Sequence, residues 1–524
     1  MRKVKRNSAL SLAALLGGDN LFSTFIRNTA ISAVAYFVIS LLGIWVTGAL
    51  ASTYGLAAFG VITLARLFSA TGLMGVFDLG APDNASHVIA QARATGDWAD
   101  AMRSVQWLLL FAFIASLFAA MIMLLVSQRL GPWLGVEKGS EDMFRQVLIV
   151  SAIVLPVCLT SQVSEGVIRG FEQYATVRGL EVFTAVAYAL GCWYLMDSGR
   201  SFFLVIYIYV ALTVVRALAA YVFAWAALRG HLSPAGSSPS GATWRVMLNR
   251  TWLVGPNKIL ATLQTQSVPL VIGLVVGVTG AAVYDLLMRL PRFVKSALGL
   301  LNSAVLPFAS RLEAANSRIT LRTLHGHGLI IVGLLTVPPL FVLAVFSEQL
   351  LYLWVGDILA RYWAWQSLAF STPMVTVIVG FASMSMFSNI EALKLMSLMV
   401  GVRLVMQYAI AWLFFDALGE RAFILGAALA VLVTAVWELK FLLNLQGVVN
   451  SVKRSLIKLF TVCGALGAAA LPVTTFAATL PLLLLGLASL SLLSWFMVWV
   501  LVIPKDLRRR LISNLKSSFF SWRK

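Results

Sequence analysis

Residues 105–126 read VQWLLLFAFIASLFAAMIMLLV and contain no charged side chain. As an α-helix, a run of this length crosses a hydrocarbon core of about 30 Å, at roughly 1.5 Å per residue. Similar apolar runs recur along almost the whole chain of 524 residues, which is 60% hydrophobic and 12% charged, with a mean hydropathy of +0.89. Soluble domains carry about a quarter charged residues. The sequence therefore predicts an all-α polytopic membrane protein without a soluble domain of any size.

The apolar pattern predicts about 14 transmembrane helices, with boundaries uncertain by a few residues. The predicted spans are 28–50, 55–79, 105–126, 146–168, 179–196, 202–227, 251–277, 280–308, 326–348, 364–388, 392–414, 422–446, 457–476 and 479–503. Between the sixth and seventh spans, residues 232–241 read LSPAGSSPSG. This composition is typical of a flexible linker, and it divides the helices into six and eight.

A short internal repeat supports a boundary at this linker. The second helix of each part opens with a similar tripeptide, AAF at 57–59 and AAV at 281–283, and carries an arginine about two turns later, Arg66 or Arg289. Many transporters are built from two such related bundles. We therefore predict two six-helix lobes and a final helix pair. The predicted parts are a basic cytoplasmic segment at 1–27, an N-terminal lobe at 28–230, a cytoplasmic linker at 231–249, a C-terminal lobe at 250–448, a final pair at 449–503 and a basic cytoplasmic tail at 504–524.

The distribution of basic residues predicts the orientation. With the N-terminus inside, we count about 27 Lys and Arg residues on the cytoplasmic side and about 6 outside, which agrees with the retention of basic loops in the cytoplasm. The formal net charge of +19 is therefore a topology signal, and no basic patch with interleaved aromatics indicates nucleic acid. Residues 1–16 resemble a signal peptide but lack a clear cleavage site, so we expect an uncleaved segment at the membrane. Both termini are expected in the cytoplasm, with the tail against anionic membrane lipids.

Charged side chains inside the apolar runs are the candidate functional residues. They are Arg66, Arg216, Lys258, Arg289, Arg292, Lys295 and Arg403. Each costs on the order of 2.5–3.5 kcal/mol at a helix centre on insertion scales, so we expect them to face a wet cavity or the bundle interior. The alternative is that they reach an interface or form interhelical ion pairs, and for Lys258 and Lys295 the two alternatives weigh equally.

Asp285 is the obvious counter-charge at this depth. It lies one turn before Arg289, and Arg292 continues the same face, so the span 280–308 is predicted to form a cavity wall with a distortion at Pro291. We expect Asp285 to pair with an arginine or to act as a protonatable coupling site. The remaining carboxylates in or near the spans are interpreted as solvated helix ends or caps. They are Asp78, Glu165, Glu181, Glu391 and Glu438.

The polar residues suggest the chemistry of a substrate. An excess of arginine in a wet cavity favours an anion, because the guanidinium fork matches phosphate oxygens and keeps its proton. Asn257, Gln264 and Gln266 are candidates for glycan contacts, although they could equally join helices. The sequence contains no P-loop, Cys-x-x-Cys, His-Glu-x-x-His or Gly-x-Ser-x-Gly motif. We expect no metal and no cofactor, and the choice between proton and sodium coupling stays open.

Several short motifs resemble those of one family. They are GLAAFG at 55–60, FDLG at 77–80, GAAVY at 280–284, LP at 306–307 and LWVG at 353–356. Together they resemble bacterial polysaccharide and O-antigen flippases of the multidrug, oligosaccharidyl-lipid and polysaccharide exporter superfamily. The resemblance implies a V-shaped pair of lobes around a cationic cavity, with two further helices, in a monomer. The implied task is to move an undecaprenyl-pyrophosphate-linked oligosaccharide from the inner to the outer leaflet of the bacterial inner membrane, with a polymerase and glycosyltransferases as candidate partners.

Rival functions differ in their charge and loops. A lipid II flippase of the same superfamily would share most of these features. A cation-coupled drug exporter would favour acidic cavities and usually about twelve helices, which the arginine excess argues against. A membrane-embedded polysaccharide polymerase or ligase would present a long outside loop with catalytic residues, whereas the longest outside loop predicted here, 127–145, has no His. We therefore expect a transporter and no enzyme.

Overall fold

The computed structural model describes residues 18–231, 243–314, 318–384, 390–446, 449–474, 479–504 and 508–509. Every regular element in these residues is a helix, which confirms the predicted all-α class. Residues 1–17 of the predicted N-terminal segment, 232–242 of the predicted linker and 510–524 of the tail lie outside the described residues.

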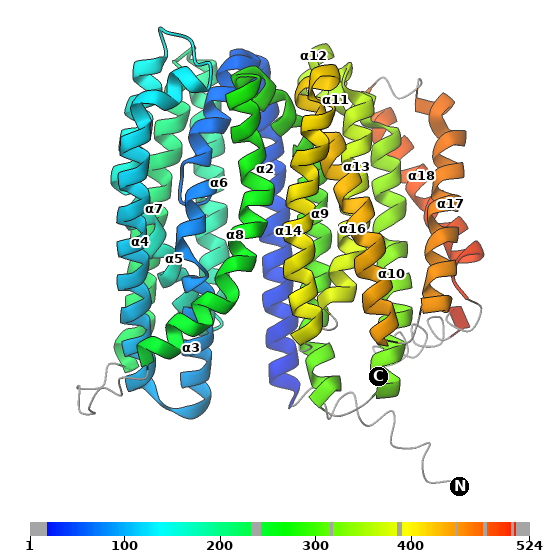
Figure 1. Cartoon of the computed structure of the whole chain (residues 1–524), viewed down its shortest axis with the longest axis horizontal. Coiled ribbons are helices and arrows are strands. Elements are labelled where there is room, and N and C mark those ends of the chain that lie inside the picture. Colours follow the sequence, from blue (N-terminus) through cyan, green and yellow to red (C-terminus); the bar gives the residue numbers. More distant parts are fainter. Residues whose placement is uncertain are drawn as a thin grey trace. The chain divides into compact units, whose positions relative to one another are not determined.

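The described chain contains eleven helices that are long and apolar enough to cross a membrane. Each predicted span except the second overlaps one long helix over most of its length. The long helices (Figure 1) are α2 Gly18–Leu67, α4 Trp98–Trp133, α5 Glu141–Gly170, α6 Tyr174–Asp197, α7 Phe203–Leu228, α8 Thr243–Val275, α9 Val278–Ala314, α10 Arg318–Val345, α13 Trp363–Met384, α14 Ile390–Leu413, α16 Ala422–Gln446, α17 Val449–Thr474 and α18 Leu480–Leu501.

The second predicted span, 55–79, is wrong as a single helix. The structure bends α2 at Gly55, where φ is 83°, and ends it at Leu67. A 3-10 helix, η1 (Leu73–Asp78), and α3 (Ala81–Thr95) follow, so α3 occupies a stretch predicted as a loop. Gly72 helps to explain the break, because a Cβ there would lie 2.3 Å from the carbonyl oxygen of Leu67. The residues of η1 are mostly apolar, so the sequence pattern of the span continues through them although the α-helix has already ended.

The remaining described elements are short helices at the ends of the long ones. They are η2 Arg229–His231, α11 Ser347–Val355, α12 Asp357–Ala360, α15 Phe415–Leu418 and η3 Gly419–Arg421. The chain folds into two compact units, Met1–Leu286 and Leu287–Lys524. The first unit thus includes α8 and the start of α9, which were predicted to belong to the C-terminal lobe.

In the first unit, α5 packs against α3, α4 and α7, and α2 packs against α6. Its core includes Ile89, Leu108 and Val167, all buried. The contact between α3 and α5 is very close, because a Cβ added at Gly166 would lie 2.1 Å from the carbonyl oxygen of Pro82. Two backbones therefore touch at this point, and a side chain has no room.

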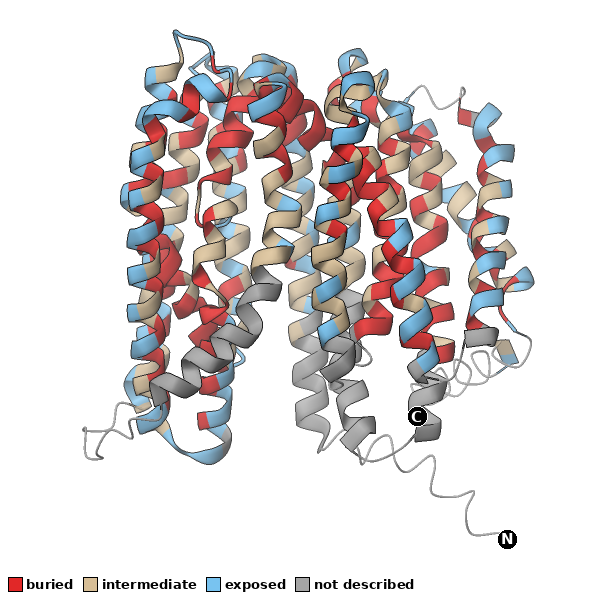
Figure 2. Ribbon diagram, viewed as in Figure 1, coloured by how far each residue is buried: buried red, intermediate tan, exposed pale blue. Residues whose placement is uncertain are grey.

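In the second unit, α10 packs against α13, α17 and α18, and α16 packs against α13 and α14. Its core includes Val377, Phe381 and Leu459. Large apolar side chains such as Trp437 and Leu485 are exposed on the surface of this unit, and exposed positions recur along the long helices (Figure 2). Apolar exposure of this kind is stable in lipid, where the bilayer takes the place of water.

Candidate functional site

Arg66 lies in the last turn of α2, inside the first unit, and is half-buried. Its guanidinium carbon is 4.6 Å from the ring centroid of Tyr209 on α7 and 5.6 Å from that of Tyr188 on α6. Both distances are within the range of a cation–π interaction. The buried carboxylate of Asp285 on α9 adds an electrostatic attraction. Arg66 is thus held inside the bundle by two aromatic rings and one acidic residue.

Hydroxyl groups connect Tyr209 to the break that follows α2. The Tyr209 hydroxyl is 2.7 Å from Thr71 Oγ1 and 3.4 Å from Ser69 Oγ. Ser69 Oγ donates a hydrogen bond to the carbonyl oxygen of Arg66 at 2.7 Å. Backbone that is not helical must find other partners at membrane depth. These side chains therefore stabilise the break and connect it to Arg66.

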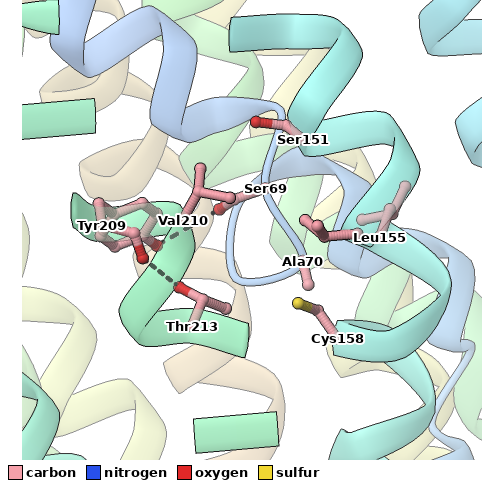
Figure 3. A pocket seen from close by; sticks show the side chains of 9 residues that line it. Ser69, Ala70, Ser151, Leu155, Cys158, Tyr209, Val210 and Thr213 are labelled. Atoms are coloured by element: carbon pink, nitrogen blue, oxygen red, sulfur yellow. Dashed lines mark hydrogen bonds between the residues drawn. The ribbon is translucent and has the colours of Figure 1, made fainter. Parts of the chain in front are cut away.

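A small pocket lies beside the same break (Figure 3). Its lining residues are Ser69, Ala70, Ser151, Val154, Leu155, Cys158, Tyr209, Val210 and Thr213. The Gln162 amide donates a hydrogen bond to the carbonyl oxygen of Ala70 at 3.0 Å. The pocket offers about 20 Å³ of space, enough for one water molecule but not for a sugar. It can hydrate the unwound backbone.

Arg216 lies on α7, two turns after Tyr209, and forms ion pairs with carboxylates. Its Nε is 2.7 Å from Glu165 Oε1, and its Nη2 is 2.9 Å from Glu165 Oε2 and 3.1 Å from Glu181 Oε1. Arg178 Nη1 lies 2.6 Å from the other oxygen of Glu181. Arg216 therefore takes the alternative that the sequence left open, an interhelical ion pair. The interpretation of Glu165 and Glu181 as solvated ends or caps is wrong, because both point into the interface of α5, α6 and α7.

Arg403 forms a second buried ion pair, in the other unit. It is 9% exposed, and its Nη2 is 2.9 Å from Oε2 of Glu438, which is 4% exposed. Arg403 Nε donates to Thr434 Oγ1 at 3.0 Å, and Ser383 Oγ donates to Glu438 Oε1 at 3.1 Å. Glu438 is therefore not a solvated helix end. Hydropathy could not reveal this, because the partners lie on three different helices.

Three cations and Glu438 form what we call the cationic cluster, defined as Arg292, Lys295, Arg403 and Glu438. Lys295 on α9 has an exposed side chain, and the charges of Arg403 and Arg292 both repel it. Within the cluster, Glu438 pairs with Arg403, and Lys295 is repelled by two neighbouring cations. An anion entering it would relieve the repulsion between the cations.

Along α9, burial falls from Asp285 onward. Asp285 is buried, Arg289 and Arg292 are half-buried, and Lys295 is exposed. On α8, Gln264 and Gln266 are half-buried. The other predicted residues of α8 cannot be placed in a site, because Asn257 and Lys258 fall in a stretch, 243–258, whose side chains lie outside the described ones.

Sequence reasoning missed the tyrosines and hydroxyls around Arg66. Tyr188 and Tyr209 lie in apolar runs in which a tyrosine is unremarkable, and only the fold brings them to one arginine. Among the side chains that the structure describes, no group of three or more His, Cys, Asp or Glu residues could hold a metal ion.

Comparison with known proteins gives a fold. No family model matches the chain, and no curated protein matches it. Among solved structures, an inward-facing multidrug resistance MATE family transporter of the MOP superfamily has a TM-score of 0.63 at 16% identity, over 79% of this chain and 94% of its own. The lipid II flippase MurJ, in an inward closed conformation, has a TM-score of 0.63 at 12% identity, over 92% and 99%.

A third structure differs in its reported chemistry. It is a MOP superfamily transporter from Pyrococcus furiosus, described by a binding pocket of reverse polarity, with a TM-score of 0.59 at 16% identity over 83% of this chain and 97% of its own. These likenesses cover most of both chains in each case. The chain therefore has the fold of the MOP superfamily transporters.

Proposed function

We propose that the protein is a flippase that moves an undecaprenyl-pyrophosphate-linked oligosaccharide from the cytoplasmic to the periplasmic leaflet by alternating access through a cationic cavity. The product would serve the assembly of O-antigen, capsule or exopolysaccharide. The observation that carries the proposal is the cationic cluster, because the charges of Arg292 and Arg403 both repel Lys295 there, while Glu438 pairs with Arg403. Bringing like charges together in the membrane is costly. A pyrophosphate group would add negative charge where the cations repel one another.

The same chemistry extends to the other predicted cations. Arg66, held by aromatic rings, and Arg289 and Arg292 on α9 are proposed to bind the phosphates during the crossing. Lys258 is proposed to contribute on α8, with Asn257, Gln264 and Gln266 as glycan contacts. Arg216 and Arg403 are proposed to bind substrate only when their ion pairs open. Asp285 would stay a partner of Arg66 or serve as a coupling site for proton or sodium.

A lipid II flippase is a second candidate. It would carry another undecaprenyl-pyrophosphate-linked glycan, and the likeness to MurJ covers 92% of this chain. The cationic cluster fits both lipids, so only the glycan would separate them. A cation-coupled drug exporter fits less well, because its cargo would bring positive charge beside Arg292, Lys295 and Arg403. A polymerase or ligase would need a set of catalytic side chains in place of the ion pairs described above.

The proposal places the protein in the bacterial inner membrane as a monomer, with both termini cytoplasmic. Polysaccharide polymerase and glycosyltransferases are its proposed partners. The direction of transport follows from where such lipids are assembled and used.

A leaflet assay in the host tests the proposal. The gene is deleted, and lipid-linked oligosaccharide is measured on each face of the inner membrane. We expect complete, unpolymerised units to accumulate on the cytoplasmic face and wild-type protein to restore their crossing. Normal crossing with unpolymerised or unligated units outside would favour the polymerase or ligase. Accumulation of lipid II in place of the oligosaccharide would favour the second candidate.

Variants connect this assay to the cationic cluster. Lys295→Ala removes the exposed cation of the cluster, and we expect it to lower export at normal protein abundance. Lys453→Ala is the matched control, because Lys453 on α17 is an exposed lysine that is not part of the cationic cluster as defined above. Equal export by both variants would remove the support that the cluster gives to the proposal.

A further inference from the structure

We infer that Tyr209 and Tyr188 are positioning residues, whose rings orient the guanidinium of Arg66 toward the phosphates of the substrate. This inference rests on the proposed function. It adds two uncharged residues to the site, which the motifs of the sequence do not indicate.

The two rings form a corner around Arg66. Their centroids are 5.8 Å apart, and the ring planes meet at 73° in an edge-to-face pair. The guanidinium carbon lies 4.6 Å from one centroid and 5.6 Å from the other. Attraction to a ring face fixes the guanidinium plane but leaves most of its N–H groups at the edge. A guanidinium held this way can still donate two parallel hydrogen bonds to a phosphate.

The ring of Tyr209 is itself fixed. Its hydroxyl lies 2.7 Å from Thr71 Oγ1 and 3.4 Å from Ser69 Oγ, both in the break after α2. Ser69 also bonds to the carbonyl oxygen of Arg66. The last turn of α2, the break and α7 are thus joined in a closed circuit of contacts. The circuit determines where the side chain of Arg66 can point.

Arg216 provides a contrast on the same helix. Its Nε and Nη2 donate to Glu165, and Nη2 donates also to Glu181. A phosphate would have to displace two carboxylates to use this fork. Two rings and the charge of one carboxylate, Asp285, hold Arg66 in place of a bidentate ion pair, so an anion reaches it at a lower cost. The geometry therefore assigns phosphate recognition in the first unit to Arg66, with the tyrosines as its support.

A double-mutant cycle tests the assignment. Binding of undecaprenyl pyrophosphate to the purified full-length protein in nanodiscs is measured by tryptophan fluorescence, for wild type, Arg66→Gln, Tyr209→Leu and the double variant. We expect each single change to weaken binding about tenfold. If Tyr209 acts only through Arg66, the double variant is also about tenfold weaker. A loss of about a hundredfold in the double variant, or wild-type affinity in Tyr209→Leu, would overturn the assignment.

Three further variants control for misfolding. Tyr209→Phe keeps the ring but loses the hydroxyl that anchors it, so it should weaken binding less than Tyr209→Leu does. Equal losses in the two variants would contradict the role of the ring. If Tyr209→Leu melts at a much lower temperature than wild type, Tyr188→Leu takes its place in the cycle with the same expected non-additivity. Tyr221→Leu is the control on α7, because Tyr221 lies about three turns beyond Tyr209 and its hydroxyl donates to the carbonyl oxygen of Val157 at 2.8 Å. It should bind like wild type.

The outcomes separate the two proposals. If wild-type protein fails to bind undecaprenyl pyrophosphate, the proposed function fails and the inference fails with it. If wild type binds but the effects of Arg66→Gln and Tyr209→Leu are additive, the proposed function stands and the positioning role is refuted.

Discussion

Glutamine in place of Glu438 gives the most informative perturbation of the cationic cluster. Glu438 is 4% exposed and lies 2.9 Å from Arg403. Its removal leaves Arg403 beside Lys295, a second positive charge. Breaking a buried ion pair from one side costs about 3–5 kcal/mol, so we expect Glu438→Gln to destabilise the protein by about 3 kcal/mol.

Removal of the other partner, in Arg403→Gln, should lower the free energy of unfolding by less than Glu438→Gln does. An arginine keeps its charge at any accessible pH, whereas a glutamate can take up a proton. Protonating an ordinary glutamate costs about 2 kcal/mol at pH 6. Because a protonated Glu438 is neutral and no longer needs a cation beside it, Arg403→Gln should lower the free energy of unfolding by no more than about this value. This loss should shrink as the pH falls, because the proton then binds Glu438 more readily. The loss in Glu438→Gln should stay nearly constant with pH.

Unfolding in detergent micelles measures both effects. The free energy of unfolding is taken from denaturant titrations followed by tryptophan fluorescence, between pH 5 and pH 8, for both single variants and the double variant. Millimolar inorganic pyrophosphate should restore more stability to Glu438→Gln than to wild type, because the anion replaces the lost carboxylate. The reasoning would be refuted if Arg403→Gln were as destabilising as Glu438→Gln at pH 5, or if its cost did not change with pH.

Three further predictions test other parts of the molecule. Arg289→Ala and Arg292→Ala should each abolish glycan export while membrane insertion stays normal. Lysine at either position should rescue export only in part, because the charge remains but the guanidinium fork is lost. Normal export by both alanine variants at normal abundance would contradict the cationic site. Gly166→Ala should destabilise the first unit by about 1–3 kcal/mol, because its Cβ would meet the carbonyl oxygen of Pro82. Gly179 on α6 has open space around it, so Gly179→Ala should be neutral or stabilising by up to about 1 kcal/mol. Equal melting temperatures of the two variants would argue against the close contact between Gly166 and Pro82. Arg216→Met should lower the melting temperature more than Arg178→Met does, because the loss of Arg216 leaves Glu165 and one oxygen of Glu181 without their ion-pair partner. A larger effect of Arg178→Met would show that Arg178 forms the more important ion pair.

Much of the fold could be predicted from hydropathy alone. A run such as 105–126 is apolar throughout, so it crosses the membrane whatever its neighbours are, and α4 contains it completely. The second crossing could not be predicted in this way. Residues 73–78 are apolar enough to extend a helix, but Gly72 allows a tight turn and η1 replaces the expected turns. Hydropathy predicts whether a segment lies in lipid or in water, but it does not predict the backbone conformation of that segment.

The site was predictable only in its charges. Arg66, Arg216 and Arg403 stand out because a cation in an apolar run is costly. Their partners do not stand out, since Glu165 lies 51 positions from Arg216 and Glu438 lies 35 positions from Arg403. Such pairs depend on which helix faces meet, and a single sequence carries no signal for this. The tyrosines around Arg66 were missed for the same reason.

The break between α2 and α3 has a consequence for the motion of the first unit. A continuous helix such as α4 transmits a tilt from one membrane face to the other, because its hydrogen bonds join every turn to the next. In the second crossing, the α-helical series ends at Leu67 and gives way to single turns, such as Ser69 N–H to the carbonyl oxygen of Arg66 and Gly72 N–H to that of Ser69, with side-chain hydroxyls as further links. We therefore expect the two halves of the crossing to be less rigidly coupled than the two halves of α4. Arg66 lies in the last turn of α2, directly before the break. A force on its side chain, such as the pull of a bound anion, therefore acts first on the break and reaches α3 only through it.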